Sequence, residues 1–133
     1  MSAKLLLIIA DEMLAKAYRI RFEREGFDIE RSSTGHEGLA RARRWLPDVI
    51  LLDLMLPGMH GLDVLKWLRD VPWLLKVPVV LLIEQTLAAD ILNECLLWGA
   101  GSYLQKDLVS LQDVVDHVHT VLQRATTDAN TSP

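Results

Sequence analysis

The sequence predicts an α/β fold, a doubly wound sheet of five parallel strands with helices on both faces. Short apolar runs alternate with helical patterns along the chain, which is typical of repeated strand–helix units joined by right-handed crossovers. The run Val49-Ile50-Leu51-Leu52 is apolar without alternation, as expected for a strand that is buried on both faces of a parallel sheet. A length of 133 residues suits one domain.

The first strand and helix are predicted from a short apolar run and the pattern that follows it. Residues 5–10 form the strand, and residues 13–25 carry a helical pattern that Gly26 ends. Residues 27–31 are more polar, so we expect a weaker strand at an edge of the sheet.

The second helix and the third strand have clear boundary signals. Thr34 and Glu37 have the spacing of a capping box, which places the start of a helix there. This helix should run to about Leu46, because Pro47 follows. The buried strand comes next and ends near Asp53.

The second half of the chain repeats the alternation. We expect helices over 62–70, 87–98 and 110–124, and strands over 77–83 and 102–105. The helix over 87–98 is apolar nearly all round, whereas a helix packed on one sheet face normally has a polar side. Part of its apolar surface is therefore expected to be exposed, which would mark a contact with a partner.

Composition narrows the possible functions. The net charge is −4 without a basic stripe, which argues against direct binding to nucleic acid. Cys95 is the only cysteine, so an internal disulfide is impossible and a cysteine metal site is not expected. The apolar run at 5–10 is too short to span a bilayer, and we expect a soluble cytoplasmic protein. We assign residues 1–124 to the domain and 125–133, which are polar and unpatterned, to a flexible tail or the start of a linker.

Polar residues follow three of the predicted strands. Asp11 comes after the first strand, Asp53 ends the third, and Lys106 follows the fifth. A buried carboxylate costs several kcal/mol unless a cation or hydrogen-bond donors compensate it. The carboxyl ends of neighbouring strands share one edge of the sheet, where ligands bind in open α/β folds.

The chemistry that suits this group is phosphoryl transfer to a carboxylate. Asp11 and Asp53 together favour Mg²⁺, which takes few protein carboxylates and keeps several waters. Lys106 supplies a positive charge for an anion on Asp53. We therefore expect Asp53 to act as a nucleophile, with Mg²⁺ and the lysine offsetting the charge.

Two stretches carry a resemblance to a known family. They are PDVILLDLMLPGMHG at 47–61 and WGAGSYLQK at 98–106, and the acidic pair Asp11-Glu12 also matches. Together they resemble the receiver domains of two-component response regulators, and the resemblance covers residues 3 to about 124.

The resemblance implies a flavodoxin-like, CheY-like sheet with strand order 2-1-3-4-5. It also implies that Asp53 is the phosphoacceptor, that Lys106 contacts the phosphoryl group, and that Asp11, Asp53 and the backbone carbonyl of Met55 are Mg²⁺ ligands. Tyr103 would be the aromatic switch residue. The partner would be a histidine kinase or a phosphotransfer protein, and the face formed by residues 87–124 would be available for a homodimer.

Three residues depart from the family pattern. Ala10 replaces the first of two adjacent acids, which should weaken Mg²⁺ binding, although Glu12 offers a substitute through a water molecule. Ile83 replaces the usual Ser or Thr, which removes a phosphate ligand and the hydroxyl that draws Tyr103 inward. Asp107 replaces a cis-proline, and a cis peptide costs a non-proline residue about 3 kcal/mol, which leaves the direction of the preceding lysine open.

Several alternatives remain beside this interpretation. The fold could serve as a pseudo-receiver, a binding or dimerisation module that works without phosphorylation. Asp11 could be only a helix N-cap, since Asp is favoured there. We do not expect a turnover enzyme, because the aspartate of the domain itself is the substrate and the domain would catalyse only its own phosphorylation and dephosphorylation. A phosphatase would need a second acid where Met55 stands.

Overall fold

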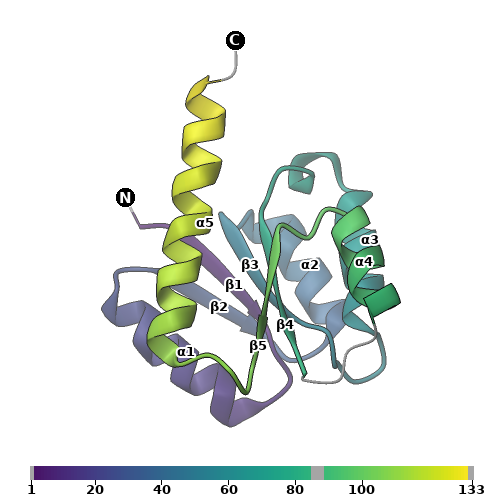
Figure 1. Cartoon of the computed structure of the whole chain (residues 1–133), viewed down its shortest axis with the longest axis horizontal. Helices are drawn as coiled ribbons and strands as arrows, with labels where there is room; N and C mark the ends of the chain where they lie inside the picture. Colours follow the sequence, from purple (N-terminus) through teal and green to yellow (C-terminus); the bar gives the residue numbers. More distant parts are fainter. Residues whose placement is uncertain (1, 85–88, 132–133) are drawn as a thin grey trace.

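The computed structural model describes residues 2–84 and 89–131, with the side chains of 126–131 excepted. It has five parallel strands in the order β2-β1-β3-β4-β5, which confirms the predicted fold class and strand order (Figure 1). The strands are β1 (Lys4–Ile8), β2 (Asp28–Ser32), β3 (Val49–Asp53), β4 (Val79–Ile83) and β5 (Ser102–Gln105). The helices are α1 (Glu12–Arg24), α2 (Gly35–Trp45), α3 (Gly61–Arg69), the short 3₁₀ helix η1 (Pro72–Leu74), α4 (Ala89–Leu97) and α5 (Leu111–Thr131).

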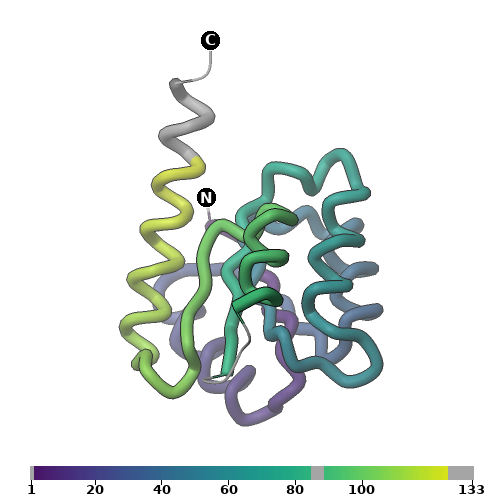
Figure 2. Tube along the Cα trace, turned by 45° about the vertical axis from the view of Figure 1, so that its right-hand side comes forward, coloured from purple at the N-terminus to yellow at the C-terminus, as the bar shows by residue number. Residues whose placement is uncertain are grey.

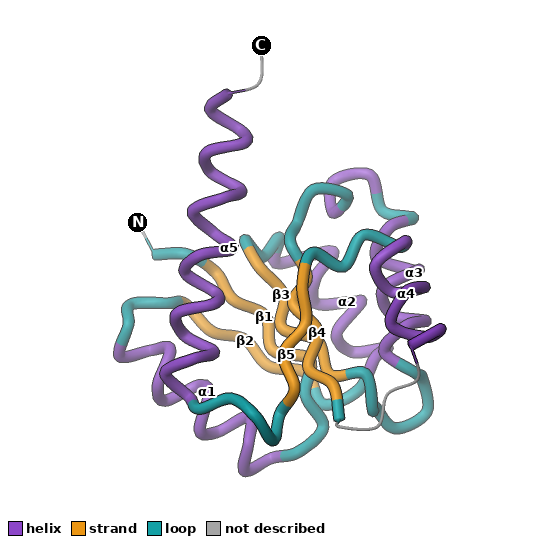
Figure 3. The backbone as a smooth tube through the Cα atoms, in the orientation of Figure 1, coloured by secondary structure: helices purple, strands orange, loops and turns teal. Residues whose placement is uncertain are grey.

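Helices cover both faces of the sheet, with α1 and α5 on one side and α2, α3 and α4 on the other (Figures 1 and 3). Successive residues of a strand point to opposite faces, so each central strand contributes to two cores. In β3, Ile50 and Leu52 belong to the core under α2, α3 and α4, whereas Val49 and Leu51 belong to the core under α1 and α5. This is why the central strands are apolar without alternation.

Three side chains define where the first helices begin. Asp11 and Thr34 accept hydrogen bonds from the backbone N–H groups three residues later, at 3.0 and 3.2 Å, which satisfies donors that the helix leaves free. The Nδ1 atom of His60 accepts from the N–H of Leu62 at 3.1 Å and so caps α3. The helix start predicted at Thr34 is confirmed, whereas the histidine cap was not predicted.

The structure corrects the prediction in two places. Helix α5 continues to Thr131, so the predicted end near Arg124 is wrong; no Gly or Pro, the two strongest helix breakers, occurs between Arg124 and Pro133. The 3₁₀ helix η1 was not predicted. The first two residues of the helix predicted over 87–98 lie outside the part that the structure describes, and α4 itself is Ala89–Leu97.

The structure confirms the predictions for the edge strand and for the apolar surface of α4. Strand β2 lies at the edge of the sheet, as its polar sequence predicted. Leu96, Leu97 and Trp98 are exposed, which confirms that part of the apolar surface of this helix faces outward. Across residues 2–84 and 89–131, no helix combines the length and apolar character that a membrane crossing requires.

Candidate functional site

The candidate site lies at the carboxyl edge of the sheet. Asp53, the last residue of β3, is 2% exposed. Ile8 is paired with Leu52 in the neighbouring strand β1, so Asp53 lies beside residue 9 and close in register to Asp11. On the other side Ile83 is paired with Gln105, which brings Lys106 to the same edge.

Lys106 and Asp53 form a direct ion pair. The Nζ atom of Lys106 donates to Oδ2 of Asp53 at 2.7 Å, and the backbone N–H of Met55 donates to Oδ1 at 3.0 Å. These contacts compensate a carboxylate that burial would otherwise penalise. The direction of Lys106, which the sequence left open because Asp107 follows it, is therefore settled: a trans peptide follows the lysine and the side chain reaches Asp53.

Glu84 is a second acidic neighbour of Lys106 that sequence reasoning missed. Its Oε1 atom lies 3.6 Å from the Nζ atom of Lys106, and the residue is 61% exposed. An ion pair of this exposure contributes little to stability. The signal was available, because Glu84 directly follows β4 as Asp53 ends β3.

The structure shows Asp11 in its capping role. Its Oδ1 atom accepts the N–H of Leu14, and both Asp11 and Glu12 are exposed. Within the described ranges no group of three or more His, Cys, Asp or Glu side chains is close enough to hold a metal ion. By chemical type the candidate donors suit Mg²⁺, since carboxylates, a backbone carbonyl and water are a normal set for this ion; Asp11 uses only its Oδ1 atom in the cap.

A guanidinium group lies next to Ala10, the position that lacks the expected acid. Arg31 donates from Nε to the carbonyl oxygen of Ile9 and from Nη2 to that of Ala10, both at 3.0 Å. The end of β1 is therefore held by a cation from β2. No local pattern in the sequence predicts this contact, because residues 10 and 31 are brought together only by the pairing of β1 with β2.

The expected switch consists of residue 83 and Tyr103, and Ile83 has no hydroxyl group to contact the tyrosine. Ile83 is 2% exposed and packs in the core under α2, α3 and α4. Tyr103 is 43% exposed, so its ring lies outward on β5. The arrangement agrees with the expectation that the usual Ser or Thr contact is missing, while the switch role of Tyr103 stays a prediction.

The turn after Asp53 packs tightly against the start of α3. The N–H of Gly61 donates to the carbonyl of Leu54 at 2.9 Å. A Cβ atom at Gly61 would lie only 2.6 Å from the carbonyl oxygen of Asp53. The close approach of this helix to the backbone beside Asp53 therefore requires glycine.

Comparisons with known proteins agree with this geometry. The family described as the response regulator receiver domain matches residues 6–119. The chain is 36% identical to the DNA-binding response regulator MtrA of Mycobacterium tuberculosis over 124 residues, 93% of this chain and 52% of that protein. It is 30% identical to the phosphate regulon transcriptional regulatory protein PhoB of Rhizobium meliloti over 125 residues, 94% of this chain and 54% of that protein.

Solved structures of receiver domains are also similar to this chain. The receiver domain of response regulator 1452 from Francisella superposes with a TM-score of 0.82 and 28% identity, covering 92% of this chain and 98% of that chain. A CheY-like receiver domain protein from Methanospirillum hungatei has a TM-score of 0.87 at 21% identity, covering 96% and 99%, which supports the fold alone. The chain spans about half the length of the curated relatives it matches. With the family match over most of its length, the chain belongs to the receiver domains of two-component response regulators.

Proposed function

We propose that this receiver domain accepts a phosphoryl group on Asp53 from a histidine kinase or a phosphotransfer protein. The observation that carries the proposal is the 2.7 Å contact between the Lys106 ammonium and the buried carboxylate of Asp53. A phosphoryl group on Asp53 adds negative charge, which needs a cation within reach. The ammonium group of Lys106 already lies beside this carboxylate.

The proposed reaction moves the phosphoryl group from a nitrogen to an oxygen. A carboxylate oxygen of Asp53 attacks the phosphorus of a phosphohistidine, the P–N bond breaks, and an acyl phosphate forms on Asp53. The imidazole leaves with the electron pair of that bond and takes a proton. Lys106 follows the negative charge from the carboxylate to the phosphoryl oxygens, and the Met55 N–H keeps the carboxyl group in place.

Asp53, the free oxygen of Asp11 and the carbonyl of Met55 would hold Mg²⁺ in this proposal. When bound there, Mg²⁺ supplies charge neutralisation for the phosphoryl oxygens. Because Ala10 provides no carboxylate, we expect weaker Mg²⁺ binding than a site with an additional acid would show, with Glu12 contributing through a water molecule. The domain would carry out only its own phosphorylation and dephosphorylation, without turning over a separate substrate.

A pseudo-receiver that works without phosphorylation is less well supported. Ala10 and Ile83 point in that direction, but the Lys106–Asp53 contact retains the central pair of the chemistry. The experiment is exposure to acetyl phosphate with Mg²⁺, followed by mild intact-mass analysis. We expect the mass of one phosphoryl group to be added to the wild type and to Asp63→Asn, an exposed-residue control, but not to Asp53→Asn. Failure of the wild type to gain the adduct would favour the pseudo-receiver.

The proposal extends to the partners. The outward-facing apolar side chains of Leu97, Tyr103 and Leu108 support a homodimer through the face formed by residues 87–124, whose first two residues lie outside the described part. MtrA is called DNA-binding, whereas this chain, with net charge −4, is predicted not to bind nucleic acid directly. The cytoplasmic location expected from the sequence belongs to the same proposal. Sedimentation before and after phosphorylation would test the dimer.

A further inference from the structure

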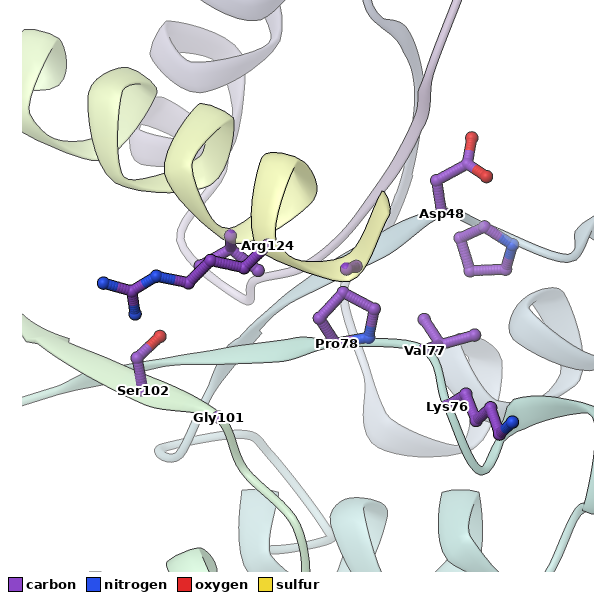
Figure 4. Close-up of a pocket in the computed structure, with 10 residues that line it drawn as sticks. Asp48, Lys76, Val77, Pro78, Gly101, Ser102 and Arg124 are labelled. Atoms are coloured by element: carbon purple, nitrogen blue, oxygen red, sulfur yellow. The ribbon is translucent and has the colours of Figure 1, made fainter. Parts of the chain in front are cut away.

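A cavity lies at the amino edge of the sheet, opposite the edge where Asp53 lies. It has a volume of about 670 Å³, within the range of small-molecule sites. Its walls come from the loops that precede β3, β4 and β5 and from the later part of α5. Figure 4 shows Arg124 reaching from α5 over Ser102, with Asp48 and Lys76 at the other end and Pro78 and Val77 between them.

The middle of this cavity is apolar. The apolar lining residues are Pro47, Val77, Pro78, Val121 and Ala125, and the two prolines present carbon atoms without N–H donors. An apolar ligand body suits these residues better than a polar one, since a polar group packed against them would lose hydrogen bonds to water.

The ends of the cavity carry an excess of positive charge. Arg124 and Lys76 are cations, whereas Asp48, the one carboxylate among the described lining residues, accepts the N–H of Lys4 at 2.7 Å. At the Arg124 end, Ser102 is held by His117, with 2.7 Å between Oγ and Nε2. Burial, and secondarily the charge of Arg124, lowers the pKa of His117.

We propose that the cavity binds a small carboxylate with an apolar, aromatic-sized body. The carboxylate would pair with the Arg124 guanidinium beside Ser102, a bidentate geometry for which arginine is suited. The body would lie against Pro78, Val77 and Val121. This site is independent of Asp53, because it is formed by the amino ends of the strands whereas the phosphoacceptor lies at their carboxyl ends.

The probe for the test is 2-naphthoate, and the neutral 2-naphthamide is the matched control ligand. Each is titrated into the ¹⁵N-labelled chain to about 5 mM, where a ligand with millimolar Kd is detectable. We expect shifts of the Val77, Gly101, Ser102 and Val121 amides, and at least fivefold weaker binding of the amide. Asp53→Asn should bind 2-naphthoate as the wild type does, since the two sites are separate.

Three variants make the test specific. Arg124→Gln should weaken 2-naphthoate at least fivefold, whereas Arg24→Gln, an exposed arginine on α1, should leave binding unchanged. Gly101→Phe should abolish it by filling the cavity, and it should fold, because a Cβ at Gly101 meets no atom within 4 Å and the residue has no positive φ. Four results would each overturn the proposal. They are shifts confined to the exposed α4 surface, the absence of shifts, equal binding of acid and amide, and shifts of the cavity lining that depend on protein concentration without ligand.

Discussion

The Asp53 side chain is buried and has a small number of polar contacts. It is 2% exposed, and its charge is met by one ammonium group and one backbone N–H. Removing one partner of such a pair costs more than removing both, because the remaining charge stays buried without compensation.

Lys106→Met should therefore destabilise the fold by roughly 2–4 kcal/mol, because it leaves the Asp53 charge unpaired. Adding Asp53→Asn to this variant should recover most of the loss, since the charge that lacked a partner is gone. Urea unfolding of both single variants and of the double variant at pH 7 measures this cycle. A double variant no more stable than Lys106→Met would show that the pair does not compensate the carboxylate.

The position of Ile83 predicts a gain of coupling to Tyr103. Ile83→Thr introduces a hydroxyl where the core side chain now offers none, so phosphorylation of Asp53 should then change the surroundings of the Tyr103 ring more than in the wild type. The chain has two tyrosines, so 3-fluorotyrosine labelling gives two ¹⁹F signals, and the signal of Tyr103 is followed in the free and phosphorylated forms. An unchanged difference between the free and phosphorylated forms of the variant would contradict this prediction.

At the level of elements, α3 and the turn after β3 form one tightly packed unit. The Cβ of an alanine at residue 61 would lie 2.6 Å from the Asp53 carbonyl oxygen and 2.6 Å from the Leu54 Cα, both backbone atoms. Neither can move without shifting the end of β3, where Asp53 lies.

Gly61→Ala is therefore expected to lower the free energy of unfolding by about 2 kcal/mol or more, in the range of overpacked cores, and to slow phosphorylation by acetyl phosphate. Gly101→Ala is the matched control, because its Cβ meets no atom within 4 Å and its φ is not positive, and it should change the stability by less than about 0.5 kcal/mol. Equal stability of the two variants would mean that the turn adapts to the methyl group.

Elements whose signals are local were predictable from the sequence, whereas contacts across the sheet were not. The alternation of strands and helices, the Thr34 cap and the exposed apolar surface of α4 followed from periodicity and capping residues, whereas the strand order followed only from the family resemblance. Arg69, by contrast, donates to the carbonyls of Leu74, Trp98 and Gly99 at 2.8, 3.1 and 2.9 Å, and no local pattern marks an arginine that joins segments 30 residues apart. The same reason hid the Arg31 contact to Ala10, since it depends on how β2 lies beside β1.

At the scale of the whole molecule, the two edges of the sheet carry different chemistry. The carboxyl edge gathers Asp53, Lys106 and Glu84, and the amino edge gathers Arg124, Lys76 and an apolar cavity. Helix α5 contacts the sheet along its first half and continues past the amino edge (Figures 1 and 2). The stability of the domain should therefore depend on the first half of α5 alone.

A chain that ends after Arg124 should keep the stability of the full chain within about 0.5 kcal/mol. Among the α5 residues whose side chains the structure describes, Val114, Val115 and Val118 are buried, with Val121 and Leu122 packed beside them, and all five remain in the shortened chain. A chain that ends after Asp116 is the control; it loses Val118, whose burial contributes about 1.5–3 kcal/mol, together with Val121 and Leu122, and should not fold stably. Thermal unfolding of the three chains measures this, and a loss above about 1 kcal/mol on removing 125–133 would place that segment inside the folded domain rather than beyond it.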